Sequence, residues 1–227
     1  MTYPWPLAIA VAFLCGSIPF GFLIGRMRGV DIREHGSRNI GATNVGRVLG
    51  RRIGLLCFVL DALKGLVPTA LAGIMNNVAG NPIAAIEPSL QWLWLATAAA
   101  ALLGHMFPPW LRFKGGKGVA TGFGALLGIY PGLTFAAVAA LVTWLLLLGL
   151  FRYVSLASML AALVIPTFVA AHAALAEGGS DGVRAALPMI LATAAIAALV
   201  VYRHRSNIAR LRRGEEPKVG RSGRRGA

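Results

Sequence analysis

The sequence predicts an all-α polytopic membrane protein with about seven transmembrane helices, and three observations support that fold class. The 227 residues are 57% hydrophobic and only 13% charged, with a mean hydropathy of +0.70. A soluble domain of this size could not bury so much apolar surface. Apolar stretches long enough to cross a hydrocarbon core of about 30 Å recur along the chain. Finally, Lys and Arg gather in the segments between alternate stretches.

Most of these stretches are continuous. We expect transmembrane helices at Trp5–Ile24, Ile53–Met75, Gln91–Phe107, Ser155–Leu175 and Arg184–Tyr202. The stretch from Gly118 to Phe151 is too long for one span, because its 34 residues would form a helix of about 50 Å. The sequence Tyr130-Pro131-Gly132 is a turn signal in its middle. It predicts two passes, with one short or broken helix near Pro131.

The distribution of positive charge predicts the orientation. With seven spans, four polar segments fall on one face of the membrane, and they hold 20 of the 22 Lys and Arg residues. These segments are Gly25–Arg52, Leu111–Lys117, Arg152–Tyr153 and Arg203–Ala227. The loops on the other face carry acidic residues and neither Lys nor Arg. By the positive-inside rule, the N-terminus lies outside and the C-terminus lies in the cytoplasm.

The domain organisation is simple. Residues 1–218 are expected to form a single transmembrane domain, followed by a basic tail, 219–227, whose Gly- and Arg-rich composition predicts disorder. Cys15 and Cys57 both lie in apolar stretches, which suits neither a disulfide framework nor a metal-ligand cluster. The cysteines thus predict no metal site. We also expect no cofactor, and no nucleic acid among the partners.

The first polar loop runs from Arg33 to Arg47 with the sequence REHGSRNIGATNVGR. Orientation in the membrane requires only its arginines. Small polar side chains among glycines let a backbone fold tightly around oxygen atoms, as anion-binding nests do. The pattern therefore favours an anion site, and the alternative is a polar loop that Ser and Asn side chains merely cap. The candidate residues are Ser37, Asn39, Thr43 and Asn44.

The second polar loop, from Arg112 to Gly122, reads RFKGGKGVATG and holds three cations and four glycines. It is not a Walker A motif, because Leu111 occupies the position where that motif needs its first glycine. What remains is a glycine turn that leads directly into a membrane helix. A helix N-terminus with free N–H groups favours an anion, and Lys117 adds a full charge beside it. The alternative is a topological signal with glycines as linker.

The third polar segment, YRHRSNIARL, begins at Tyr202 where the last span leaves the membrane. His204 and Asn207 are three residues apart and share a helix face if the helix continues. A lone interfacial His is more often a packed residue than a catalyst, so this segment alone leaves both interpretations open. Inside the second span, Asp61 and Lys64 can neutralise each other, as a structural pair or as a functional site. His105 is interpreted as structural.

Taken together, the three segments resemble the motifs of the bacterial acyl-phosphate-dependent glycerol-3-phosphate acyltransferases. The matching segments are HGSRNIGATNVGR, RFKGGKGVATG and YRHRSNIARLRRGEEPK, in this order and all on the predicted cytoplasmic face. The resemblance extends to about Lys218, and it is the ordered set of three that makes it specific. It implies a seven-helix integral membrane fold. It also implies transfer of an acyl group from acyl phosphate to the 1-hydroxyl of glycerol 3-phosphate, which gives lysophosphatidic acid in the first step of phospholipid synthesis.

The resemblance implies a role for each matching residue. The first motif supplies a phosphate-binding set, namely Ser37, Thr43 and Arg47, with Asn39 and Asn44 inside the same motif. The glycerol 3-phosphate loop corresponds to Gly115, Gly116, Lys117 and Gly118. The remaining matches are a site serine, Ser155, the catalytic-site pair His204 and Asn207, and a structural acid, Glu216. The chain departs from the family at Arg38–Asn39–Ile40, where many relatives have Gly–Asn–Pro.

The chemistry implied by the resemblance explains the cations. An acyl phosphate and glycerol 3-phosphate bring roughly four negative charges together, and Arg47 and Lys117 would offset their repulsion. The resemblance implies that a substrate phosphate oxygen accepts the hydroxyl proton, with His204 as the second choice. It also implies a location in the bacterial cytoplasmic membrane, with the active site on the cytoplasmic face. Expected partners are the bilayer and the soluble enzyme that makes acyl phosphate.

A transporter of phosphorylated small solutes is the main alternative function. Basic clefts suit such a protein, and broken helices like the one near Pro131 occur in transporters. Against it, the polar groups cluster on one face, and Asp61–Lys64 is the sole charged candidate near the midplane. The sequence therefore favours the acyltransferase.

Overall fold

The computed structural model describes residues 4–176 and 178–220, and within those ranges the chain forms helices joined by loops, with no strand. The longer helices are α1 Trp5–Ser17, α2 Phe20–Met27, α3 Ala42–Leu49, α4 Arg51–Met75, α5 Pro88–Met106, α6 Val119–Gly128, α7 Thr134–Phe151, α8 Val154–Ala176, α10 Leu187–Arg203 and α11 Arg205–Arg212. Shorter pieces are η1 Ile83–Ala85, η2 Pro109–Leu111 and α9 Ser180–Ala185. The predicted all-α fold class is confirmed.

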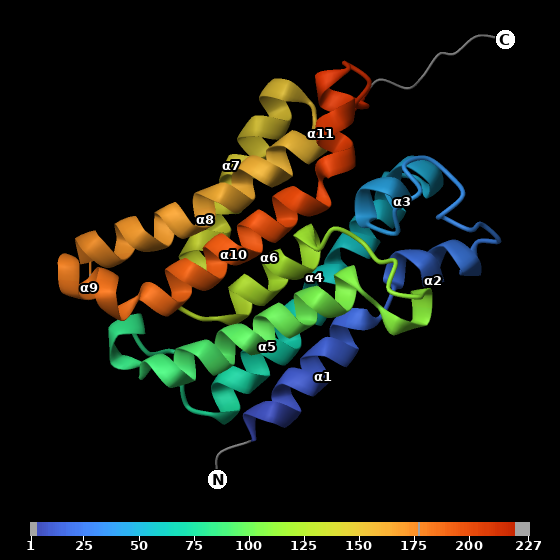
Figure 1. The fold of residues 1–227 in the computed structure, drawn as a ribbon. Coiled ribbons are helices and arrows are strands. Elements are labelled where there is room, and N and C mark those ends of the chain that lie inside the picture. Colours follow the sequence, from blue (N-terminus) through green and yellow to red (C-terminus); the bar gives the residue numbers. More distant parts are fainter. Residues whose placement is uncertain (1–3, 177, 221–227) are drawn as a thin grey trace, which may run out of the picture.

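Two groups of helices lie on either side of α6 (Figure 1). Helices α1, α4 and α5 pack together, and α7, α8 and α10 form the second group. Helix α6 contacts α4 and α5 on one side and α7 on the other, and α10 also contacts α5. The fully buried side chains of Trp94, Leu133 and Met189 belong to one apolar core that both groups share.

Close contact between α4 and α6 depends on residues without a side chain. A Cβ on Gly65 would lie 2.2 Å from the backbone oxygen of Thr121, and one on Gly124 would lie 1.9 Å from that of Ala62. Small residues at helix interfaces let backbones approach closely, which is the usual way membrane helices gain packing energy in lipid. The glycines therefore hold α6, and the loop before it, against α4.

Several helices are long and apolar enough to cross a membrane. In the described ranges these are the segments Trp5–Met27, Arg51–Met75, Pro88–Leu111, Thr134–Phe151 and Val154–Ala176. Helices α10 and α11 meet the same criterion only when taken together, and they are bent by 55° where they join. The remaining predicted pass is α6, whose ten residues extend only about 15 Å. The short helix expected before Pro131 is therefore present, and the orientation of the termini stays a prediction.

Some predicted helix boundaries were wrong for local reasons. The span expected at Trp5–Ile24 is broken at Ile18–Pro19 into α1 and α2, since Pro cannot continue the helical hydrogen bonds. The span expected from Arg184 begins three residues later at Leu187, followed by Pro188 in the first turn. Arg184 itself lies in α9, exposed and 3.5 Å from Asp181.

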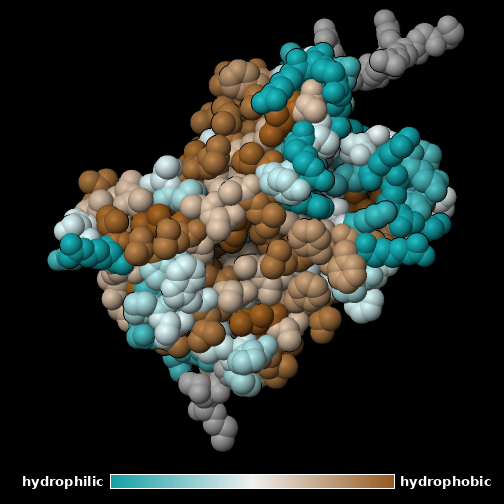
Figure 2. All heavy atoms as spheres, in the orientation of Figure 1, coloured by the Kyte–Doolittle hydropathy of each residue, from teal (hydrophilic) through white to brown (hydrophobic). Residues whose placement is uncertain are grey.

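Hydrophilic side chains gather at the end of the molecule where α2, α3 and α11 lie, while apolar side chains cover much of its middle (Figure 2). The loop from Arg33 to Gly41 is part of that polar end. Arg38 has a φ of 57°, in the left-handed region that favours glycine. The departure noted from the sequence at this position thus places an Arg in a backbone conformation that L side chains rarely adopt.

Candidate active site

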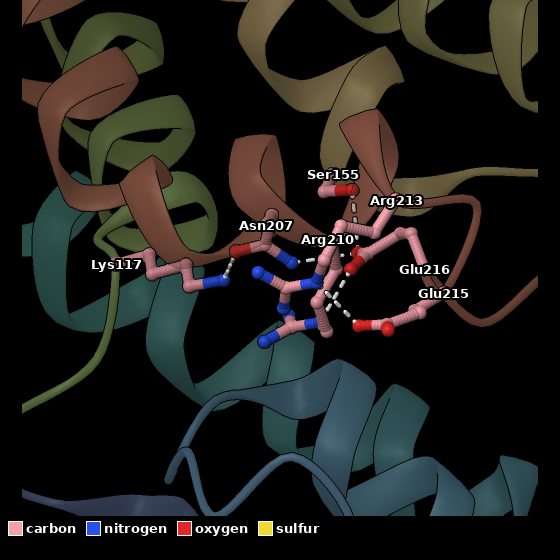
Figure 3. A network of polar contacts seen from close by, with 7 residues as sticks. All are labelled: Lys117, Ser155, Asn207, Arg210, Arg213, Glu215 and Glu216. Atoms are coloured by element: carbon pink, nitrogen blue, oxygen red, sulfur yellow. Dashed lines mark hydrogen bonds and ion pairs between the residues drawn. The ribbon is translucent and has the colours of Figure 1, made fainter.

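Side chains from separate parts of the chain form one polar network (Figure 3). The ammonium of Lys117, in the loop before α6, donates a hydrogen bond to Oδ1 of Asn207 in α11. Nδ2 of Asn207 and Oγ of Ser155, at the start of α8, each donate to Oε1 of Glu216 at 2.6 Å. Nε of Arg210 donates to Oε2 of Glu216 at 2.8 Å. The network therefore joins the end of the chain to α8 and to the loop before α6.

Glu216 is the acid at the centre of this network, and its side chain is buried. Burial raises the pKa of Glu216, but hydrogen bonds from Ser155, Asn207 and Arg210 outweigh burial, so its pKa falls below the usual value. Glu216 is thus a carboxylate at neutral pH. Because this carboxylate holds the amide nitrogen of Asn207, the amide oxygen faces Lys117.

Lys117 is half-buried, and its pKa is lowered to about 8. Burial is the main cause, and the nearby cations Arg210, Arg47 and Arg203 act in the same direction against the opposing charge of Glu216. The ammonium is still mostly protonated at pH 7. An anionic ligand beside it would meet a cation that has already lost much of its water.

The network borders a cavity of about 500 Å³ with two chemically different ends. At one end lie the first polar loop, Lys117, Glu216 and the start of α11. The other end runs between α6, α7, α8 and α10 and is lined by apolar side chains, among them Phe123, Leu141 and Ile165. This shape suits a ligand with an anionic head and a long apolar chain.

Asn44 organises the first polar loop. Its side chain is 1% exposed; Oδ1 accepts the N–H of Ser37 at 2.7 Å, and Nδ2 lies within 3.0 Å of the carbonyls of Ile32, His35 and Asn39. Both ends of this amide are therefore engaged with the loop backbone. Asn44 therefore holds the loop in shape around the cavity, and its contact with phosphate stays a prediction.

Two glycines of the second loop, Gly115 and Gly116, have partners in the backbone. The N–H groups of Gly115 and Gly116 donate to the carbonyls of Met106 and His105, both at 3.1 Å. Both N–H groups thus have backbone partners in this structure, and phosphate binding by Gly115 and Gly116 stays a prediction. Their lack of a Cβ serves packing, since one on Gly116 would lie 2.0 Å from Nε2 of His105.

Lys117 and Gly118 stay available at the start of α6. Gly118 has a φ of 83°, and it lines the cavity together with Lys117 and the first turn of the helix. The N–H groups at a helix N-terminus have no intrahelical partner and carry partial positive charge. The predicted anion-binding position at the entrance to α6 is therefore open to the cavity.

His204 lies at the bend between α10 and α11 and is 3% exposed. Its Nδ1 is 2.8 Å from the carbonyl oxygen of Val200, which can only accept a hydrogen bond. The ring proton is therefore on Nδ1, and Nε2 keeps a lone pair. Burial, reinforced by the charge of Lys117, lowers the pKa of His204 to about 4. The imidazole is neutral at physiological pH.

Most of the site residues predicted from sequence meet at this cavity, and Gly115 and Gly116 are the two that do not line it. Those lining it are Ser37, Asn39, Thr43, Asn44, Arg47, Lys117, Gly118, Ser155, His204 and Asn207. Sequence reasoning missed Arg210, although it follows Asn207 by three residues and thus shares its helix face. In the described ranges, no group of three or more His, Cys, Asp or Glu side chains is placed to share a metal ion.

Comparison with known proteins agrees with this geometry. The family model described as glycerol-3-phosphate acyltransferase matches residues 6–214. The chain belongs to the glycerol-3-phosphate acyltransferase family. Curated relatives of that name are found in Geotalea daltonii, 46% identical over 90% of this chain and 92% of the relative, and in Trichlorobacter lovleyi, 41% identical over 92% and 95%.

Solved structures support the same assignment. The crystal structure of PlsY (YgiH), an integral membrane glycerol 3-phosphate acyltransferase in its glycerol 3-phosphate form, has a TM-score of 0.78 and 37% identity. The match covers 95% of this chain and 96% of that one. Its lysophosphatidic acid form has a TM-score of 0.76 and 36% identity, with 95% coverage of both chains. The family assigned by resemblance is thus confirmed, and the cavity described above is the candidate active site of a glycerol-3-phosphate acyltransferase.

Proposed function

We propose that this chain transfers an acyl group from acyl phosphate to the 1-hydroxyl of glycerol 3-phosphate, giving lysophosphatidic acid and inorganic phosphate. Family membership supports the acceptor. We further propose that the protein works in the bacterial cytoplasmic membrane with this site on the cytoplasmic face, where 20 of the 22 Lys and Arg residues are predicted to lie. The soluble enzyme that makes acyl phosphate is its proposed partner.

The observation that supports this reaction most directly is the cavity with a cationic end and an apolar end. Arg47, Lys117 and Arg210 lie around the cationic end, where the paired acid is Glu216. Two phosphate groups need several cations in a pocket of low dielectric constant. The apolar end would hold the acyl chain beside the bilayer, so that the carboxyl-phosphate group of the donor meets the acceptor at the junction.

The proposed reaction is an acyl transfer by addition and elimination. The 1-hydroxyl oxygen of glycerol 3-phosphate forms a bond to the acyl carbon, the bond between that carbon and the phosphate oxygen breaks, and phosphate leaves with the bonding electron pair. Phosphate is a good leaving group. The main task of the protein is therefore to hold the two substrates in line, a contribution on the order of 7 kcal/mol or more in ideal cases.

The proton of the hydroxyl needs an acceptor. His204 has its lone pair on Nε2, but a pKa of about 4 makes it a weak base. A phosphate group with a second pKa of about 6 is the stronger base at neutral pH. We therefore propose that a substrate phosphate oxygen takes the proton, and that neutral His204 accepts a hydrogen bond that orients the hydroxyl.

The experiment that tests this function is a donor comparison with the purified full chain in detergent. Glycerol 3-phosphate is supplied with palmitoyl phosphate in one arm and palmitoyl-CoA in the other, and lysophosphatidic acid and released phosphate are measured. We expect equal amounts of both products from palmitoyl phosphate and none above background from palmitoyl-CoA. Comparable turnover with palmitoyl-CoA would show that the donor assignment is wrong.

A further inference from the structure

A buried polar cluster lies directly beneath the loop that carries Lys117. Asp61 and Lys64 of α4 form an ion pair, with Nζ 2.7 Å from Oδ1, and both side chains are almost completely buried. Nζ of Lys64 also donates to the carbonyl of Ile18 at 2.7 Å, at the break between α1 and α2. Nδ1 of His105, near the end of α5, lies 3.6 Å from the same oxygen of Asp61.

The opposite edge of the His105 ring faces the glycine loop. The three heavy atoms nearest to a Cβ built on Gly116 all belong to this imidazole: Nε2 at 2.0 Å, Cε1 at 2.8 Å and Cδ2 at 3.0 Å. The backbone of His105 also contacts Gly116, because the carbonyl of His105 accepts the N–H of Gly116 at 3.1 Å. Asp61 and His105 both line the cavity beside Lys117.

From the other side, Arg203 of α10 fixes the same loop. Its Nη2 donates to the carbonyl of Gly116 at 2.8 Å and of Gly115 at 3.2 Å. Gly116 therefore lies between the His105 ring and the Arg203 guanidinium, and Lys117 is the next residue. A shift at Gly116 moves the ammonium that reaches Asn207.

We propose that His105 is a positioning residue: packed beside the Asp61–Lys64 ion pair, its imidazole sets the place of Gly116 and so aims the Lys117 ammonium at the substrate phosphate. This inference deepens the proposed function and rests on it. Burial of an ion pair carries a large desolvation cost, which geometry and further hydrogen bonds must offset. A fixed position for the loop that carries Lys117 would explain why this buried cluster lies next to the cavity despite its desolvation cost.

The test is a size-complementation experiment on glycerol 3-phosphate binding, measured by calorimetry on the purified full chain without any donor. Gly116→Ala should weaken binding more than tenfold, because its methyl group collides with the ring. His105→Ala should weaken binding three- to tenfold, because the loop loses its support. In the double variant the methyl group fits the space that the ring has left, so it should bind more tightly than Gly116→Ala alone.

Two controls separate positioning from folding. His172→Ala removes a histidine that stacks on Phe168 in α8 and does not line the cavity, so its binding should equal wild type. If His105→Ala does not fold, His105→Ser, which also empties the space of the ring, replaces it in the single and double variants. Melting temperatures in detergent show that each variant is folded. His105→Gln, which keeps a polar group of similar reach, should restore part of the affinity that Ala loses.

Each outcome decides the proposal. Wild-type affinity in His105→Ala, or a double variant that binds as weakly as Gly116→Ala alone or more weakly, would overturn it. Because binding is measured without a donor, failure of the acyl-phosphate assignment would show only in the donor comparison. If the binding pattern differs from the expected one while palmitoyl phosphate still serves as donor, the role of His105 is overturned and the donor assignment stays intact.

Discussion

Lys117 and Asn207 are 90 residues apart in the chain, and the ammonium of the first donates a hydrogen bond to the amide oxygen of the second. The contact connects the glycine loop before α6 to the last helix, α11. It exists because Glu216 holds the other end of the same amide at 2.6 Å. A cation, an amide and a carboxylate thus form one chain of contacts at the polar end of the cavity, and the first predictions concern its members.

Replacing Lys117 with Ala should lower kcat/KM for glycerol 3-phosphate by about tenfold to a hundredfold. A charge-assisted contact contributes about 1.5–3 kcal/mol, which corresponds to that range. Steady-state kinetics with palmitoyl phosphate measures the effect. The matched control is Lys114→Ala, since Lys114 lies three residues earlier in the loop, is exposed and does not line the cavity. Equal kinetics for the two variants would mean that the loop serves only as a signal for membrane topology.

The pH dependence should show an alkaline limb near pH 8 in kcat/KM for glycerol 3-phosphate. The pKa of Lys117 is lowered to about 8, so the cation is fully present below that pH and is lost as the pH rises through it. Lys117→Arg should move the limb to higher pH, because a guanidinium stays charged. An unchanged limb in this variant would assign it to another group.

His204→Gln should lower kcat by about tenfold to a hundredfold without changing the acid limb of the profile. With a pKa of about 4, His204 is already neutral above pH 5, so an acid limb near pH 6 belongs to phosphate. The profile of kcat/KM from pH 5 to 9 checks this expectation. If the limb disappears in His204→Gln, the imidazole is the base after all.

Glu216→Gln should destabilise the protein by about 2–3 kcal/mol, because Arg210 then loses its charged acceptor and Asn207 its fixed orientation. Since the pKa of Glu216 is lowered in the folded state, its contribution is present at neutral pH and is lost as the pH falls through its folded pKa. Thermal unfolding in detergent at pH 7 measures the loss. Glu215→Gln is the control, because Glu215 is exposed and pairs with exposed Arg213.

Filling the apolar end of the cavity should shorten the preferred acyl chain. Ala197 of α10 is 2% exposed and lines the cavity, so Ala197→Leu should reduce turnover of palmitoyl phosphate at least several-fold more than turnover of octanoyl phosphate. Ala198→Leu, on the exposed side of the same helix, is the control. An equal loss of turnover with both donors would mean that the acyl chain does not lie beside Ala197.

The proposed orientation can be tested by labelling single cysteines in a background without Cys15 and Cys57. A cysteine at Ser180 in α9 should react with an impermeant reagent added outside intact cells. One at Ser222, in the tail beyond the described residues, should react only after the cells are opened. Labelling of both from outside would contradict the predicted cytoplasmic C-terminus.

Much of the architecture followed from short-range properties of the sequence. Apolar length predicted the long helices, and the signal at Tyr130-Pro131-Gly132 predicted where α6 ends and a new helix begins. The three polar motifs named nearly all the side chains that line the polar end of the cavity. These signals act within a few residues or along a single helix, so they can be interpreted before any tertiary contact is known.

The tertiary structure determined which of those residues face the cavity with free polar atoms and which hold the loops in place. Whether an amide or an N–H group is free depends on partners that packing brings from elsewhere: Gly116 turned out to be bonded to His105, and Asn44 to its own loop. In the same way the carboxylate of Glu216 meets Ser155, 61 residues earlier, because α8 and α11 converge. Residue type and spacing determined which groups could act. Packing of distant helices determined which polar atoms remained unbonded and faced the cavity, since hydrogen-bond partners are settled by geometry in three dimensions.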